Sequence, residues 1–442
     1  MKRNSSNKYI FYNDIQPKNN TLLYDIDEVP ATWRELLIYA LQQLMAVFVA
    51  TVLIANICGT PVSSCLCGAG AATIIYQLIT GFKSPMFISS CGATCSAVIG
   101  ALAMSNGDYM TVIVGGAIIF VVYALFAFIL KRKSKQILDR IFPATIVGPV
   151  TMVIGLNLAG FIPTYVQVNG SYNIYGTLVA IVTMAIVAAT SHYGKGFLKT
   201  IPFLIGLLAG YAISVVLTLT GVCKLIDFTV FKFDGLFALP DFTFAHASLN
   251  AASGKFFQIL ALFLPVAICA MLEHYSDHKV LSNIIGTDLT EKPGLWRTLL
   301  GDGAASFFGT IVCGLPNTSY GESIATTGFS RVASVSVIST AAIMLIVLSV
   351  VKPVQAFIAS VPSCVFGGCA MILYGYIVVS GLKTLINSGA DFNNNRTLVV
   401  VSVILTVGVS GIWLFDAAFA GVSLAMVLGV VLNLALKEKK NA

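Results

Sequence analysis

Residues 315–323 read LPNTSYGES: a proline, then small and hydroxylated residues, then a glutamate, all ahead of a short apolar run. Residues 83–96, KSPMFISSCGATCS, follow a similar pattern. Each stretch predicts an extended segment that leads into a half-helix. Non-helical backbone persists at membrane depth only where protein buries it or where it lines a cavity, so both stretches mark a candidate site. For residues 83–96, a packing helix rich in glycine and serine is the alternative.

The composition places the whole chain in a membrane. Of its 442 residues, 57% are hydrophobic and 10% are charged, against about 45–50% and about 25% in soluble domains. This composition excludes a cytosolic enzyme. The net charge is +7, but the basic residues lie in short runs between apolar blocks, which indicates membrane topology and no nucleic-acid partner. The ten cysteines fall almost entirely in apolar segments, and we expect them to pack as small hydrophobes.

Fourteen apolar blocks follow one another along the chain, and most reach the length of about 20 residues that a spanning helix needs. The sequence therefore predicts an all-α polytopic membrane protein with fourteen transmembrane segments, two of which are half-helices preceded by short extended stretches. The blocks are 37–57, 61–81, 86–104, 110–130, 143–161, 174–192, 200–220, 257–281, 298–314, 320–333, 334–351, 362–386, 397–415 and 418–436.

Basic residues near helix ends predict the orientation, because they favour the cytoplasmic side. With the amino terminus inside, all lysines and arginines but four fall in cytoplasmic segments, and the exceptions are Lys224, Lys232, Lys255 and Lys352. We therefore expect a multi-pass protein of the cell (inner) membrane with both termini in the cytoplasm. Residues 1–36 form a polar tail without the apolar core of a signal peptide, and residues 437–442 form a second cytoplasmic tail.

The two halves of the chain share sequence patterns. The pattern P-x4-G-x3-M at residues 143–152 recurs at residues 362–371, seven blocks later, and the two proline-led stretches are also seven blocks apart. An odd offset reverses the direction in which the chain enters the membrane. The pattern predicts two inverted seven-segment repeats, 37–221 and 257–436, joined by an extracellular connector at 222–256. Inverted repeats with discontinuous helices are typical of secondary transporters that bind substrate near the midplane.

Three acidic residues, Glu273, Asp277 and Glu322, lie away from tails, loops and helix ends. A charged carboxylate near the bilayer centre costs about 2.5–3.5 kcal/mol on insertion scales, so each is a functional candidate. Glu273 and Asp277 share one helical face, and Glu322 begins a half-helix whose N–H groups can hold polar ligand atoms. Glu273 and Glu322 together could grip a flat heterocycle with N–H donors and carbonyl acceptors. Burial favours a protonated carboxylate, so we expect uptake to be proton-coupled. His274 and His278 are expected to be interfacial or packing residues.

Several further motifs point to a known family. They are EH at 273–274, Asn283, KPGLWR at 292–297, PNTSYGE at 316–322, VFGG at 365–368, LYG at 373–375 and VGVSG at 407–411. In these residues the chain resembles the nucleobase–ascorbate transporter family, closest to its bacterial uracil permeases, from about residue 36 to the carboxy terminus. The resemblance implies fourteen segments in two inverted repeats, a core and a gate domain that move as an elevator, and import of a nucleobase, most of all uracil, with protons. It also implies a homodimer through the gate domain.

The resemblance assigns roles to individual residues. Glu273 and Glu322 are implied to bind the substrate, with the backbone around Tyr320 and Gly321 at the base of the site. Glutamate at position 322 favours a pyrimidine such as uracil over xanthine. Cys91, Gly92 and Ser323 complete the substrate-binding set. Proton coupling is assigned to Glu273, Asp277 and Gln43, since uracil permeases commonly carry a histidine where Gln43 stands.

The chain also departs from the family pattern. Uracil permeases commonly carry a stacking phenylalanine where Gly92 aligns, so Gly92 leaves room for a bulkier ligand or for another aromatic side chain such as Phe87. The family motif has asparagine and glycine where this chain has Ser323 and Ala325. These departures leave a xanthine or other purine carrier, or a small-anion carrier on the same fold, as alternatives.

Other activities find little support in the sequence. A channel is a further alternative that the buried acids do not exclude. A membrane-embedded enzyme is disfavoured, because no aspartate-rich pair, nucleophile with a histidine partner or metal set is visible. The Cys91-x3-Cys95 pair has no acid or histidine beside it in the sequence, so packing is favoured over a metal site. We therefore expect neither a cofactor nor a metal, and the expected partners are a nucleobase, protons and the lipid bilayer.

Overall fold

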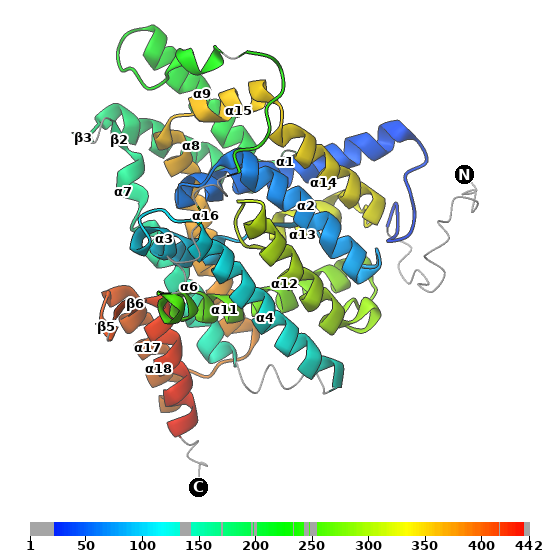
Figure 1. The fold of residues 1–442 in the computed structure, drawn as a ribbon, viewed down its shortest axis with the longest axis vertical. Helices are drawn as coiled ribbons and strands as arrows, with labels where there is room; N and C mark the ends of the chain where they lie inside the picture. Colours follow the sequence, from blue (N-terminus) through cyan, green and yellow to red (C-terminus); the bar gives the residue numbers. More distant parts are fainter. Residues whose placement is uncertain are drawn as a thin grey trace.

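The computed structural model of the chain describes residues 22–132, 143–168, 171–195, 198, 201–232, 234–242, 247, 254–414 and 416–436. The outer part of the expected amino-terminal tail, the expected carboxy-terminal tail and parts of the expected connector lie outside these residues. Every one of the fourteen apolar blocks contains a helix, and the protein is mostly α-helical as the sequence predicts (Figure 1).

The helices pack as two bundles that each combine segments from both halves of the chain. In the first bundle, the densest contacts are those of α2 and α4 with α12, and of α2 with α14. Its helices are α1 (Trp33–Cys58), α2 (Val62–Thr80), α3 (Cys95–Met104), α4 (Met110–Arg132), α11 (Phe256–Ile285), α12 (Leu295–Ile311), α13 (Gly321–Ser330) and α14 (Val335–Ser349).

The second bundle is centred on the contact between α6 and α16. Its helices are α6 (Ala144–Ala159), α7 (Ile162–Tyr165), α8 (Ile174–Tyr193), α9 (Pro202–Leu219), α16 (Ser363–Asn387), α17 (Asn395–Ser410) and α18 (Val422–Ala435). Two hairpins accompany these helices, β2 (Gln167–Val168) with β3 (Ser171–Tyr172), and β5 (Trp413–Leu414) with β6 (Asp416–Ala420). The bundles meet where α11 contacts α18 and where α1 contacts α9 and α16.

Short elements connect the bundles. The helix α15 (Lys352–Ser360) leads from α14 to α16, and the 3-10 turn η3 (Phe228–Phe231) of the connector packs against it. Within the first bundle, a π-helical turn, η5 (Thr290–Gly294), lies between α11 and α12. Eight helices among the described residues are long and apolar enough to cross a membrane, namely α1, α2, α4, α6 together with α7, α8, α9, α11 and α16. The shorter apolar helices are α3 with its preceding turn, α14, α17 and α18.

The two proline-led stretches form extended segments followed by short helices, which confirms that prediction. Strand β1 (Ile88–Ser90) leads through a 3-10 turn at Gly92–Thr94 into α3, and strand β4 (Asn317–Ser319) leads into α13. Helices α3 and α13 have ten residues each, half the length of a spanning helix. The strands pair antiparallel with each other, Ile88 opposite Ser319 and Ser90 opposite Asn317. Each strand therefore satisfies backbone groups of the other inside the first bundle.

Side chains of the surrounding helices hold the strand pair. Thr73 Oγ1 of α2 donates to the Ile88 carbonyl at 2.7 Å and accepts from the Ile88 N–H at 3.1 Å. Thr51 of α1 shares a hydrogen bond with Ser89 at 2.6 Å, and Ser306 of α12 donates to the Asn317 carbonyl. The strand pair is thus hydrogen-bonded to three helices, and both half-helices begin directly after this two-stranded sheet.

The amino-terminal segment that precedes α1 lies against the first bundle. Leu23 N donates to the Arg331 carbonyl at 2.8 Å and Ala333 N donates to the Tyr24 carbonyl at 2.9 Å, directly after α13. Leu22 and Ile26 are buried in an apolar cluster with residues of α2, α11 and α13. Within the expected tail 1–36, the part next to α1 is therefore packed onto the protein.

Candidate functional site

The first turn of α13 is open although the strand before it is buried. Asn317, Thr318 and Ser319 are at most 4% exposed, whereas Gly321 is exposed and Glu322 is half-buried. A Cβ placed on Gly321 would meet no heavy atom within 4 Å. The free N–H groups at the start of a helix favour negatively charged or hydrogen-bond-accepting ligand atoms. This opening can therefore receive a polar ligand.

The acidic residues of α11 lie next to this opening. Glu273 is exposed although its neighbours Leu272 and His274 are 8% and 0% exposed, so Glu273 is the accessible side chain of the three. The Glu273 and Glu322 carboxyl groups lie within electrostatic range of each other, and α11 packs against α13. Asp277, one turn after Glu273, is half-buried and accepts a hydrogen bond from Ser319 Oγ at 2.6 Å. The structure thus brings together the three acids that the sequence singles out.

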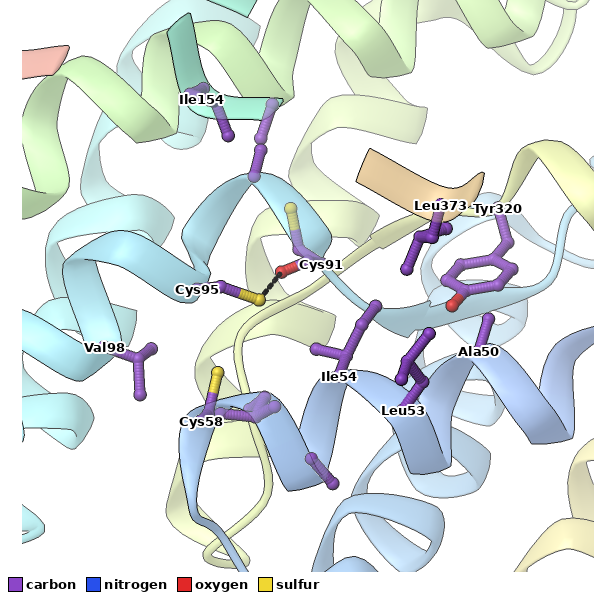
Figure 2. Close-up of a cluster of buried hydrophobic side chains, with 14 of the residues drawn as sticks. Ala50, Leu53, Ile54, Cys58, Cys91, Cys95, Val98, Ile154, Tyr320 and Leu373 are labelled. Atoms are coloured by element: carbon purple, nitrogen blue, oxygen red, sulfur yellow. Dashed lines mark hydrogen bonds between the residues drawn. The ribbon is translucent and has the colours of Figure 1, made fainter. Parts of the chain in front are cut away.

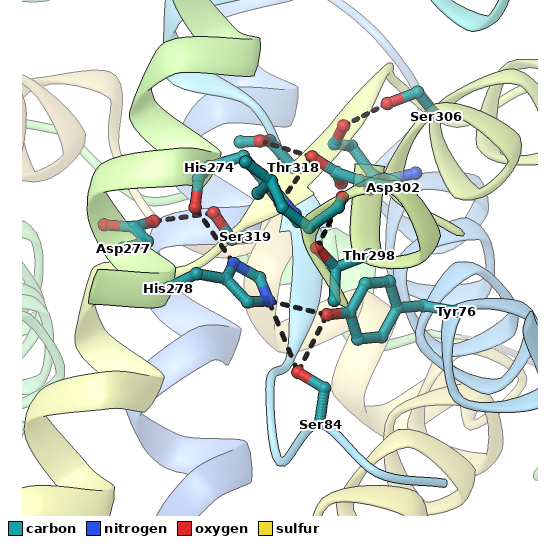
Figure 3. Close-up of polar contacts among 12 residues, drawn as sticks. Tyr76, Ser84, His274, Asp277, His278, Thr298, Asp302, Ser306, Thr318 and Ser319 are labelled. Atoms are coloured by element: carbon teal, nitrogen blue, oxygen red, sulfur yellow. Dashed lines mark hydrogen bonds and ion pairs between the residues drawn. The ribbon is translucent and has the colours of Figure 1, made fainter. Parts of the chain in front are cut away.

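A fourth acid, Asp302, is buried behind the strand β4 and was missed by the sequence analysis. Its Oδ2 accepts from Thr318 Oγ1 at 3.1 Å and lies 2.9 Å from His274 Nδ1, with both side chains 0% exposed (Figure 3). Successive strand residues point to opposite faces. Asp302 and Asp277 therefore hold Thr318 and Ser319 from two sides. Asp302 lies near the start of its apolar block, where an acid resembles one at a helix end. Its position between two glycines in an apolar segment is the signal that could have revealed it.

His274 and His278 belong to this buried network and lie at no interface with lipid, since both are 0% exposed. Their rings lie close together, with centroids 4.1 Å apart and the ring planes tilted by 36°. His278 Nδ1 lies 2.9 Å from the His274 carbonyl, which only accepts, so Nδ1 carries the proton. His278 Nε2 then accepts from Tyr76 at 2.9 Å or from Ser84 at 3.3 Å (Figure 3). Through His278, these hydrogen bonds link α11 to α2 and to Ser84, which precedes β1.

Gln43 of α1 is bound to the half-helix α13 through its amide. Its Oε1 accepts from Ser323 Oγ at 2.9 Å, and its Nε2 donates to Thr327 Oγ1 at 3.0 Å and to the Ser323 carbonyl at 3.4 Å. All three residues are at most 2% exposed. An amide takes up no proton near neutral pH, so the direct contribution of Gln43 is to fix the helix that carries Glu322. Ser323 likewise faces Gln43 and not the opening.

The remaining expected site residues lie at the other half-helix and at the contact between bundles. A Cβ on Gly92 would meet only Ile377 Cδ1 at 3.5 Å and Ile54 Cδ1 at 3.9 Å, which are ordinary contacts. Two isoleucines thus border Gly92, the position at which uracil permeases commonly carry a stacking phenylalanine. Phe87, the aromatic side chain suggested as a replacement, is 0% exposed and packs in the core. The Tyr320 ring lies over α1 (Figure 2), and only 6% of the residue is exposed, so the ring is packed inside the protein.

Cys91 lies beside Gly92 with its side chain in an apolar cluster. It is 1% exposed, its backbone N–H donates to the Pro316 carbonyl at 2.9 Å, and its carbonyl faces Cys95 Sγ at 3.8 Å (Figure 2). Among the described residues, no group of three or more histidine, cysteine or acidic side chains is arranged to hold a metal ion. The arrangement of open acids, helix N-terminus and buried hydroxyls is suited to hydrogen bonding of a small polar molecule.

Comparison with known sequences gives consistent matches over nearly the whole chain. The model of the Permease family (Xan_ur_permease) matches residues 34–417. The uracil permease of Bacillus subtilis is 35% identical over 414 residues, which are 91% of this chain and 92% of the relative. The uracil permease of Escherichia coli K12 is 34% identical over 407 residues, 90% of each chain.

Comparison with solved structures identifies the fold. The structure of SLC26A9 superimposes with a TM-score of 0.67 at 13% identity, over 90% of this chain and 64% of that one. The transmembrane domain of the cyanobacterial bicarbonate transporter BicA gives a TM-score of 0.63 at 15% identity, over 90% of this chain and 96% of that one. At these identities the likeness concerns the fold alone.

We predict that Asp302→Ala destabilises the protein far more than Asp302→Asn. Removing one partner of a buried hydrogen bond costs about 1–3 kcal/mol, because the other partner is left buried and unsatisfied, whereas asparagine keeps an acceptor for Thr318. The temperature of thermal unfolding of the purified protein measures the effect, with the exposed Asp234→Ala as the control. Unfolding of Asp302→Ala at the wild-type temperature would contradict a structural role for this network.

Proposed function

Because the chain belongs to the nucleobase–ascorbate transporter family, we propose that it is a secondary transporter that imports a nucleobase, most of all uracil, together with a proton. The observation that carries the proposal is the pair Glu273 and Glu322, which are accessible at one opening while the residues around them are buried. The uracil permeases of two bacteria, each similar over at least nine-tenths of the chain, support the nucleobase as the substrate class.

Uracil fits the chemistry of the opening. It is a flat ring with two N–H donors and two carbonyl acceptors. Glu322 accepts from ring N–H groups, a protonated Glu273 donates to a ring carbonyl, and the backbone at Tyr320 and Gly321 forms the base. The ring face lies toward Gly92, where the ends of Ile54 and Ile377 offer apolar contact.

Proton coupling follows from two acids in one opening. Two carboxylates close to each other repel when both are charged, so a proton on Glu273 favours binding of the substrate. Loss of that proton on the cytoplasmic side restores the repulsion and weakens binding. Asp277 is bound to Ser319 and lies one turn away, where it can exchange the proton with Glu273. Gln43 supports the cycle by holding α13.

The transport cycle is an elevator movement of the first bundle, the core domain, against the second bundle, the gate domain. Fourteen segments in two inverted repeats, 37–221 and 257–436, underlie both bundles. Three observations support the repeat: β1 and β4 pair antiparallel, each precedes a ten-residue helix, and Pro143 and Pro362 are the N-caps of α6 and α16, which pack together. The proposed substrate site lies where the half-helices of the core face the gate.

The proposed setting is the cell membrane, with both termini in the cytoplasm and the connector 222–256 outside. A homodimer through the gate domain is part of the proposal. Helices α8 and α9 of that domain are the least buried of the long helices, since only 28% of the apolar stretch of each is buried inside the protein. They therefore offer apolar surface to lipid or to a second copy of the chain.

A xanthine or other purine carrier is the second candidate, because Gly92 adds no side chain of its own beside Ile54 and Ile377. A small-anion carrier shares the fold of SLC26A9 and BicA, but two acids at the opening would repel an anion. A channel is a less favoured alternative, and uptake that saturates with substrate and requires a proton would argue against it.

The first test of the mechanism is Glu273→Gln in proteoliposomes. We expect uptake of labelled uracil driven by a pH gradient to be abolished, since glutamine can still donate to a ring carbonyl but can neither take up nor release a proton. Glu291→Gln, an exposed acid in the turn after α11, is the matched control and should transport normally. Full proton-driven uptake by Glu273→Gln would remove Glu273 from the coupling role.

The second test concerns the substrate. Ligands that bind only the folded protein raise its unfolding temperature, by an amount equivalent to about 2.7 kcal/mol at a hundredfold excess over Kd. We expect uracil to raise the unfolding temperature of the purified protein more than xanthine, hypoxanthine or bicarbonate. A larger shift with a purine would assign the protein to the second candidate, and competition against labelled uracil uptake provides an independent measurement.

A further inference from the structure

The connector exposes a group of large apolar side chains outside the spanning helices. Leu239 is 83% exposed, Phe237 68% and Leu236 63%, and Phe228 and Phe231 are about two-fifths exposed at 41% and 40%. We call these five residues the connector patch. Soluble surfaces rarely display so many large apolar side chains together, so a partner is expected to cover them.

The connector patch continues an apolar surface that begins on a spanning helix. Val216 and Leu219 at the end of α9 are 59% and 73% exposed, and Val222 in the first turn of the connector is 50% exposed. At the other end of the connector, Phe256 and Phe257 at the start of α11 are 45% and 78% exposed. Both helices are long and apolar enough to span the bilayer. The surface that faces acyl chains along these helices therefore runs directly into the connector.

Hydrogen bonds hold the connector patch at this level of the molecule. Ala238 N donates to the Val350 carbonyl and Lys352 N donates to the Leu236 carbonyl, both at 2.9 Å, where α14 ends. Asp241 N donates to Ser63 Oγ at 3.2 Å, at the start of α2. The connector lies at the end of the molecule opposite the carboxy terminus (Figure 1). The exposed side chains thus project from a backbone that is fixed where α14 ends and where α2 begins.

Charge does not select the partner. Residues 222–256 contain three lysines and three aspartates. The pKa of Asp227 lies below its ordinary value because the Thr229 backbone N–H donates to its carboxylate, so this acid is charged at neutral pH. A balanced segment gains little from acidic lipid headgroups, and long lysine side chains can reach water while their stems cover apolar surface.

We propose that the connector patch inserts into the boundary between headgroups and acyl chains of one leaflet and anchors the connector to the bilayer. The partner is the lipid surface, held by burial of apolar area and not by lipid charge. The anchor would hold the connector at a fixed depth in the membrane. The connector runs from α9 of the second bundle to α11 of the first bundle. This inference does not depend on which substrate the protein carries.

The experiment replaces Phe237 by the photoreactive p-benzoylphenylalanine in the full chain, reconstituted in vesicles of phosphatidylcholine or of phosphatidylglycerol. A matched control carries the same replacement at Asn393, an exposed residue of the polar turn between α16 and α17. After irradiation, we expect lipid adducts at position 237 in equal yield in both kinds of vesicle. The variant with the replacement at position 393 is expected to give only a small fraction of that yield. Mass spectrometry of the intact protein measures the adducts.

Four outcomes would overturn the proposal. Covalent dimers in place of lipid adducts at position 237 would make the connector patch an interface between two copies of the chain. Adducts that form only in phosphatidylglycerol would make the contact electrostatic. Equal lipid labelling at positions 237 and 393, or no labelling at either, would mean that the connector patch has no particular contact with the bilayer.

Discussion

The whole site depends on how the protein satisfies the backbone of two short strands within a membrane. Acyl chains offer no hydrogen-bonding partner, so non-helical backbone at this depth must find its partners in the protein. The strands β1 and β4 do so by pairing with each other, Ile88 opposite Ser319, and by backbone hydrogen bonds to the side chains of Thr73 and Ser306 on neighbouring helices. Because the two strands form one sheet, the positions at which the two half-helices begin are fixed relative to each other.

The same constraint divides the acids into two kinds. Asp277 and Asp302 are engaged with Ser319 and Thr318 of the strand β4, and Asp302 is backed by His274. Glu273 and Glu322 have no such role and remain accessible. Buried acids without partners would be costly, so the hydroxyls of the strand and the histidine offset part of the cost of keeping two acids there. What is left open is a pair of carboxyl groups beside the free N–H groups of a helix.

Much of this arrangement could be predicted from the sequence, for identifiable reasons. Proline followed by small hydroxylated residues ahead of a short apolar run gave the strands and half-helices, and acids within apolar segments gave Glu273, Asp277 and Glu322. Asp302 was missed because it stands near the start of its block, where an acid is commonplace. The pairing of Gln43 with Ser323 and Thr327, and the burial of His278 against Tyr76, could not be predicted, because they join residues far apart in the chain. Neither periodicity nor motif spacing specifies which helices become neighbours.

The central claim is that Glu273 and Glu322 face one ligand between a half-helix and the long helix beside it. A structure of the protein determined with uracil at saturating concentration tests it most directly. The account predicts ring density within hydrogen-bonding distance of both carboxyl groups and of the backbone at Gly321. Density for the ligand elsewhere, or in contact with only one of the two acids, would contradict it.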